Sequence, residues 1–161
     1  MFCFRGNLKQ AIIGAYTLYD PTAERIDIDS AYPNPSFNWN LASDDQALIK
    51  LKQPSTKPTV TLNFDPSIPG QEGEAITVIG FGSTASGTLP NVLQQTTVNY
   101  IANNVCASLK SGPNSYQGKI TSDMICVHGS SSGQCNGDSG GPYLLLGNSY
   151  ATDVQVGIVS W

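Results

Sequence analysis

Charged residues, histidine and long apolar runs are scarce in this sequence. Its 161 residues include 8 Lys and Arg, 12 Asp and Glu, and one histidine, so that the formal net charge is −4. No run of basic residues is present to neutralise phosphates, which argues against a nucleic-acid partner. No apolar stretch approaches the roughly 18 residues that a membrane-spanning helix needs, so no membrane partner is expected.

Cysteine is sparse as well. The four cysteines, Cys3, Cys106, Cys126 and Cys135, contain no C-x-x-C pair. Because His128 is the single histidine, neither a zinc site nor another metal site is predicted, and no cofactor is expected. Disulfide bonds are the interpretation that this spacing favours.

Glycine and proline, by contrast, are plentiful. The chain has 16 Gly and 10 Pro, and it is rich in Ser, Thr and Asn, a composition typical of short strands joined by many turns in a β-sandwich or barrel. Strands are predicted at 11–18, 25–29, 45–51, 59–63, 75–82, 92–100 and 124–127, with a short helix within 101–109. Two prolines and two glycines within 66–73 indicate a linker, which divides the chain into lobes 1–69 and 70–161.

One hexapeptide carries the clearest chemical signal. Gly137-Asp138-Ser139-Gly140-Gly141-Pro142 follows Cys135 and precedes an apolar run. Flanking glycines allow the tight turn on which an exposed nucleophilic serine stands, so Ser139 is the candidate nucleophile. The backbone N–H groups of Gly137 and Ser139 could form an oxyanion hole. A glycine-rich turn before a strand can also be purely structural, but the complete string from Cys135 favours catalysis.

The segment 135–142 resembles the nucleophile motif of the trypsin/chymotrypsin-like serine proteases. The stretch 157–161, Gly-Ile-Val-Ser-Trp, resembles the strand that lies beside the substrate in that family. The resemblance implies an all-β fold of two Greek-key β-barrels, the first truncated at its N-terminus and the second at its C-terminus. The implied activity is that of a serine endopeptidase, whose partners would be a protein or peptide substrate and a protein inhibitor.

Further roles follow from the same resemblance. Asp45 begins an Asp-x-Ala-Leu-Ile-x-Leu segment similar to the family's aspartate strand, so it is the expected catalytic carboxylate, whereas Asp44 beside it is expected to be solvated. Cys106 and Cys126 are expected to form a disulfide. In the family, the partner of the cysteine matched by Cys135 follows the Ser-Trp strand, and this sequence stops at Trp161.

The catalytic histidine is the point at which the pattern fails. Matching Cys3 to the cysteine that follows the family's histidine puts Phe2 in the histidine's place, and phenylalanine cannot accept a proton. His128 falls in a pocket loop and is not predicted to replace it. Two interpretations stay open: an inactive fragment of a serine endopeptidase, which is favoured, or a non-catalytic homologue that acts as a binding or inhibitory module.

Specificity and location are also implied by the family. Gly133 occupies the base of the primary pocket without a carboxylate, so preference for Lys or Arg is not expected. Ser160 and Trp161 are expected to bind an extended substrate.

Asp138 is expected to be an unpaired buried charge whose turn rearranges, as in an inactive precursor. The apolar start of the sequence is too short for a signal peptide, so an extracellular location is inferred from the family and the cysteines alone.

Overall fold

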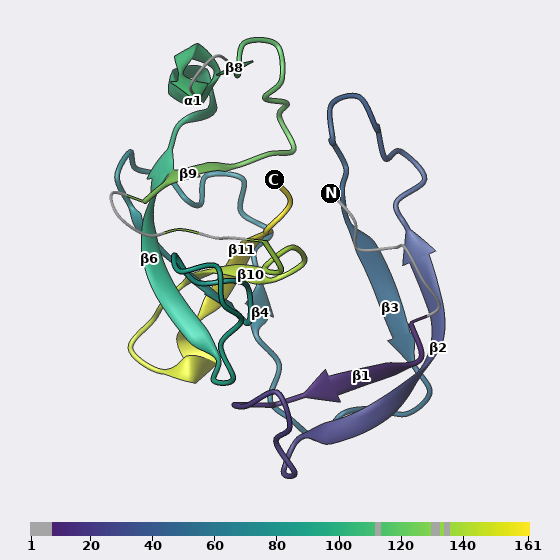
Figure 1. The fold of residues 1–161 in the computed structure, drawn as a ribbon. Helices are drawn as coiled ribbons and strands as arrows, with labels where there is room; N and C mark the ends of the chain where they lie inside the picture. Colours follow the sequence, from purple (N-terminus) through teal and green to yellow (C-terminus); the bar gives the residue numbers. More distant parts are fainter. Residues whose placement is uncertain (1–7, 112–113, 130–132, 134–135) are drawn as a thin grey trace.

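The computed structural model describes residues 8–111, 114–129, 133 and 136–161. Within them the chain is nearly all-β, as predicted, with one α-helix and one short 3-10 helix (Figure 1). The elements are β1 (Gln10–Ile13), β2 (Glu24–Pro33), β3 (Ala47–Leu51), β4 (Thr61–Leu62), β5 (Ala75–Gly80), β6 (Gln94–Ile101), α1 (Asn103–Ser108), β7 (Lys110–Ser111), β8 (Asn114–Ser115), β9 (Cys126–His128), β10 (Pro142–Leu145), η1 (Tyr150–Thr152) and β11 (Val154–Ile158).

The first lobe is the antiparallel sheet β1-β2-β3, with β2 in the centre. Polar and apolar residues alternate along β2, and Ile26 on its inner face is buried. The strand predicted at 11–18 is shorter than expected, because β1 ends at Ile13. Gly14 follows with φ +77°, a left-handed conformation that interrupts the strand and that glycine adopts without strain.

The second lobe is a six-stranded sheet of order β4-β11-β10-β5-β6-β9. β5 lies at its centre between β10 and β6, and all six residues of β5 are paired with β6. The buried core is formed by Ile76, Val78, Val98, Tyr143 and Val159. Since β10 lies beside β5, this core supports the turn that carries Ser139 directly before β10.

The short strand β4 lies on the second sheet, although it precedes the predicted linker. Thr61 and Leu62 pair in parallel with Val154 and Gln155 of β11. The strand predicted at 59–63 therefore has only two residues in the ladder. The lobe boundary after residue 69 remains a prediction, and the chain already joins the second sheet before it.

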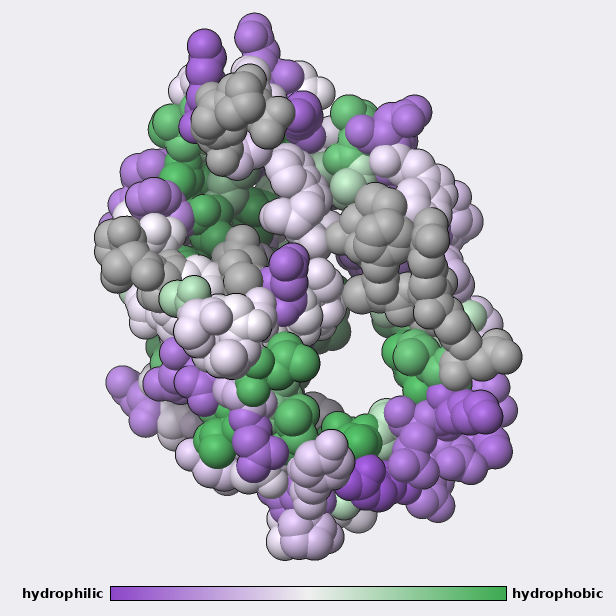
Figure 2. Space-filling model, in the orientation of Figure 1, coloured by the Kyte–Doolittle hydropathy of each residue, from purple (hydrophilic) through white to green (hydrophobic). Residues whose placement is uncertain are grey.

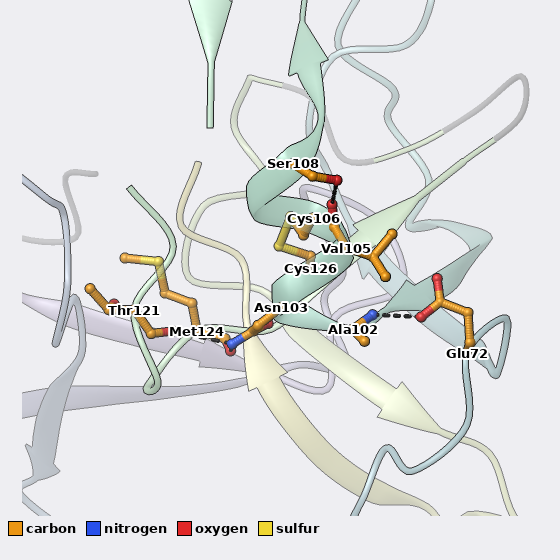
Figure 3. Close-up of a disulfide and its surroundings, with 9 residues drawn as sticks. All are labelled: Glu72, Ala102, Asn103, Val105, Cys106, Ser108, Thr121, Met124 and Cys126. Carbon is orange, nitrogen blue, oxygen red and sulfur yellow. Dashed lines mark hydrogen bonds between the residues drawn. A yellow bond between two sulfur atoms is a disulfide. The ribbon is translucent and has the colours of Figure 1, made fainter. Parts of the chain in front are cut away.

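The helix predicted within 101–109 forms as α1, and it is attached to β9 by a disulfide. Cys106 of α1 and Cys126 of β9 are joined, with their Cα atoms 6.2 Å apart (Figure 3). The backbone N–H of Ala102, which precedes the helix, donates to Glu72 Oε2 at 2.8 Å. The predictions for Phe2, Cys3 and Cys135 lie outside the described residues.

The two lobes meet along segments 16–18 and 91–93. Thr17 and Val92 form an isolated antiparallel bridge, flanked by the hydrogen bonds Leu18 N to Asn91 O and Leu93 N to Tyr16 O. The molecule is hollowed between the lobes, and hydrophobic residues gather around the lower part of the opening (Figure 2). None of the described residues belongs to a helix long and apolar enough to cross a membrane.

Candidate active site

Ser139 is exposed on a turn that depends on glycine. Gly137 and Gly140 have φ values of +100° and +87°, in the left-handed region that residues with a Cβ rarely adopt. At Gly141 a Cβ would approach Asp138 O to 2.8 Å, and the Gly141 N–H donates to that same oxygen at 2.8 Å. The turn is thus closed on itself, with the serine hydroxyl outside.

Two hydrogen bonds attach this turn to the end of β11. The Gly140 N–H donates to Val159 O, and the Val159 N–H donates to Gly141 O, each at 2.8 Å. Val159 is buried in the core of the second lobe, 4% exposed. The position of Ser139 is therefore tied to the backbone directly before Ser160.

The N–H groups predicted to form an oxyanion hole are available in this arrangement. Among the hydrogen bonds between described residues, none uses the backbone N–H of Gly137 or Ser139. Both groups belong to the same exposed turn. Among the described residues, donation from these groups to an anionic oxygen over Ser139 would break no hydrogen bond, as the predicted oxyanion hole requires.

Asp138 is half-buried and paired, so the expectation of an unpaired charge is wrong. Its Oδ1 accepts a hydrogen bond from the Gly82 N–H at 2.8 Å. A Cβ on Gly80 would lie 2.0 Å from the same oxygen, so the carboxylate fits in this position only because residue 80 has no side chain. Nearby, burial and then the charge of Asp138 raise the pKa of Tyr143 to about 12.

Asp45 lies two residues before β3, in a tight turn closed by a hydrogen bond from Gln46 N to Asp44 O at 2.9 Å. The side chain is half-buried, and its Oδ2 accepts a hydrogen bond from Ser160 Oγ at 2.6 Å. A hydroxyl that donates to a carboxylate restricts its orientation. Sequence reasoning gave Ser160 only a role in contacting substrate and missed this side-chain contact.

A short chain of contacts thus joins the candidate nucleophile to the candidate carboxylate. Ser139 precedes Gly140, which is bonded to Val159, and Val159 precedes Ser160, which is bonded to Asp45. The last of these bonds crosses from the second lobe to the first, between residues 115 positions apart. The fold brings the two predicted catalytic residues to the same junction between the lobes.

Comparison with known proteins agrees with this geometry. The family model described as Trypsin matches residues 3–161, nearly the whole chain. The chain belongs to the trypsin family. It is 37% identical to cationic trypsin-3 of Rattus norvegicus over 144 residues, which are 84% of this chain and 52% of the rat protein.

Two other trypsins extend the comparison. The chain is 35% identical to trypsin of Sus scrofa, over 80% of this chain and 52% of the pig protein. It is 32% identical to trypsin I-P1 of Gallus gallus, over 99% of this chain and 62% of the chicken protein. The chain spans about half the length of the curated relatives it matches first.

This trypsin-family chain has a cleft of about 870 Å³ beside the candidate site. Asp45, Ser160 and Trp161 line it, and the ring of Trp161 lies 6.0 Å, centroid to centroid, from that of Tyr116. Ser139 is not among the lining residues. The cleft therefore borders the carboxylate and the aromatic pair, and the nucleophile stands outside it.

The remaining predicted site residues are less enclosed. Gly133 is exposed, and a Cβ built there would have no described atom within 4 Å. His128 is exposed at the end of β9, three positions away from β10 in the strand order, although it lines the same cleft as Asp45. Asp44 is half-buried and hydrogen-bonded through its backbone and side chain, so the expectation that it is solvated is wrong. The described residues contain no group of three or more His, Cys, Asp or Glu placed to hold a metal ion.

Proposed function

We propose that this chain belongs to a serine endopeptidase in which Ser139 is the nucleophile and Asp45 orients the general base. The observation that carries the proposal is the hydrogen bond from Ser160 Oγ to Asp45 Oδ2, because it fixes the carboxylate at the junction where the Ser139 turn is anchored. A carboxylate held in this way can accept a hydrogen bond from a neighbouring imidazole and so hold that ring in one tautomer. It can also stabilise the imidazolium that forms when the ring gains a proton.

The chemistry would proceed through an acyl-enzyme. Ser139 Oγ bonds to the carbonyl carbon of the scissile peptide while its proton passes to the histidine, and the C–N bond then breaks as that proton moves to the leaving amine. The N–H groups of Gly137 and Ser139 bind the oxyanion, and each such donor contributes roughly 10²- to 10³-fold to the rate. Water then hydrolyses the acyl group and restores the serine.

The sequence itself supplies no histidine for this step. His128 is the single histidine, and β5 and β6 separate its strand, β9, from β10. We therefore infer that these 161 residues alone do not catalyse efficient proteolysis, since the loss of the triad's base costs on the order of a millionfold in rate. The base would be a histidine of the whole protein, outside this sequence.

The substrate would be a protein or peptide that is not selected for Lys or Arg. Gly133, at the predicted base of the primary pocket, carries no carboxylate to pair with a cation, so a neutral, apolar or aromatic side chain is favoured. Trp161 and Tyr116 offer a flat apolar surface beside the cleft for an extended chain. A protein inhibitor would bind the same surface, and the disulfide suits an extracellular location.

A fluorophosphonate probe, followed by mass spectrometry of the labelled peptide, tests the proposal. The 161-residue chain should label slowly, and the protein that also carries the missing histidine should label rapidly on Ser139. Rapid labelling of the chain alone would contradict the assignment of the base. No labelling of the whole protein would favour the other candidate, a non-catalytic homologue that binds or inhibits.

A further inference from the structure

A carboxylate of the second lobe holds the turn that carries Asp45. The backbone N–H of Asp44 donates to Asp123 Oδ2 at 2.8 Å, between residues 79 positions apart. Asp123 lies in the second lobe, in the segment that leads into β9, whereas β3 belongs to the first lobe. The bond therefore ties the second lobe to the backbone directly before the candidate catalytic carboxylate.

The turn that Asp123 holds has an unfavourable backbone conformation. Ala42 and Asp44 have φ values of +52° and +56°, in the left-handed region that costs residues with a Cβ free energy. Such conformations persist where surrounding contacts enforce them. Ser43 between them is 8% exposed, and Asn34 Nδ2 donates to Asp44 Oδ1 only at 3.4 Å. The bond to Asp123 is the shorter of these two polar contacts with Asp44.

Asp123 is attached to a rigid base in its own lobe. Asn103 Nδ2, from α1, donates to Thr121 O at 3.2 Å and to Met124 O at 2.8 Å, and so holds both ends of the turn that contains Asp123 (Figure 3). The same helix is joined by Cys106 to Cys126, two residues beyond Met124. A shift of the backbone that carries Asp123 would therefore require movement of the turn against α1.

The protonation state of Asp123 favours this hydrogen bond. Burial raises the pKa of its carboxyl, but the N–H of Asp44 and the neighbouring Thr121 hydroxyl lower it, and the net result is a pKa below the ordinary value of 3.8. The side chain is therefore ionised at neutral pH. An ionised acceptor makes the stronger hydrogen bond to a backbone N–H.

We propose that Asp123 is a positioning residue for Asp45: it acts through the Asp44 backbone and holds the carboxylate against Ser160 from the opposite lobe. The proposal rests on the proposed function for its catalytic consequence, but the contact itself is independent of it. Asp45 is then fixed at two points, at its side chain by Ser160 and at the preceding peptide by Asp123. Loss of the second contact removes the hydrogen bond by which Asp123 holds the peptide before Asp45 and leaves the bond from Ser160 to the side chain.

Hydrogen exchange at the Asp44 amide, followed by NMR on the 161-residue chain, tests the contact directly. Asp123→Ala should accelerate exchange at Asp44 by about tenfold, whereas Asp123→Asn, which keeps an acceptor oxygen but loses the charge, should accelerate it less. Glu72→Ala is the matched control, because it removes a carboxylate bond of the same length, 2.8 Å, to the Ala102 N–H. Because Asp123 is exposed, its substitution should not prevent folding. Asp123→Ser is a second variant whose shorter side chain removes the carboxylate.

Fluorophosphonate labelling of Ser139 in the protein with its histidine tests the catalytic consequence. Asp123→Ala should slow labelling by about tenfold, and Asp123→Asn, which keeps an acceptor oxygen without the charge, should slow it less. Unchanged exchange at Asp44 in Asp123→Ala, equal acceleration in Asp123→Asn, or the same acceleration in Glu72→Ala would overturn the proposal. If the parent protein never labels, the proposed function fails, while the exchange result still decides the contact.

Discussion

The bond between Ser160 and Asp45 offers the most direct test of how the lobes are held together. Ser160→Ala removes a 2.6 Å hydrogen bond to a half-buried carboxylate. Hydrogen bonds to charged groups contribute about 1.5–3 kcal/mol, and the partial exposure of Asp45 places the expected loss near the lower end, about 1–2 kcal/mol. We expect the midpoint of urea unfolding to fall while its slope stays the same.

Two variants bracket this result. Ser160→Thr keeps the hydroxyl and should lose less stability than Ser160→Ala. Ser108→Ala also removes a hydrogen bond of 2.6 Å, from Ser108 Oγ to Val105 O. Because this acceptor is uncharged and lies at an exposed helix end, the free energy of unfolding should fall by no more than about 0.5–1 kcal/mol. If Ser160→Ala costs no more than Ser108→Ala, the bond between the lobes does not contribute as we argue.

Three further outcomes are expected. Gly80→Ala should destabilise the second lobe by about 2 kcal/mol or more, measured by urea unfolding, because its Cβ would lie 2.0 Å from Asp138 Oδ1; a neutral result would mean that the carboxylate can move away. Since burial raises the pKa of Tyr143 from 10.0 to about 12, its contribution to stability is complete below pH 10 and should be lost as the pH rises through 12; Tyr143→Phe should abolish this part of the alkaline decline. Gly133→Asp in the whole protein should shift preference towards peptides with Lys or Arg, and unchanged peptide cleavage ratios would place Gly133 outside the pocket.

Local signals account for the elements that sequence analysis placed well. The pattern around Ser139 predicts a glycine turn because Gly137 and Gly140 must adopt positive φ, and the structure has both there. The β-branched residues of 75–80 predict a buried strand, and β5 provides Ile76 and Val78 to the core. These features depend on the conformational preferences of a few adjacent residues.

Other expectations failed where a distant segment decides the outcome. The strand predicted at 59–63 shrinks to Thr61 and Leu62, because only these two residues have ladder partners in β11. Asp44 is half-buried and not fully solvated, since Asn34 donates to its carboxylate and Asp123 of the other lobe accepts from its N–H. Asp138 is paired with the Gly82 N–H, 56 positions away, and nothing in the local sequence indicates that donor.

The sequence by itself therefore determined the family, the nucleophile turn, the β-rich character and the identities of Ser139 and Asp45 as candidates, because motif residues and short-range preferences are written in adjacent positions. Only the tertiary structure decided that Ser160 bonds Asp45 and that Asp123 holds the turn before it. Both contacts join residues at least 79 positions apart. Side chains so distant meet through the packing of one lobe on the other, which no local pattern encodes.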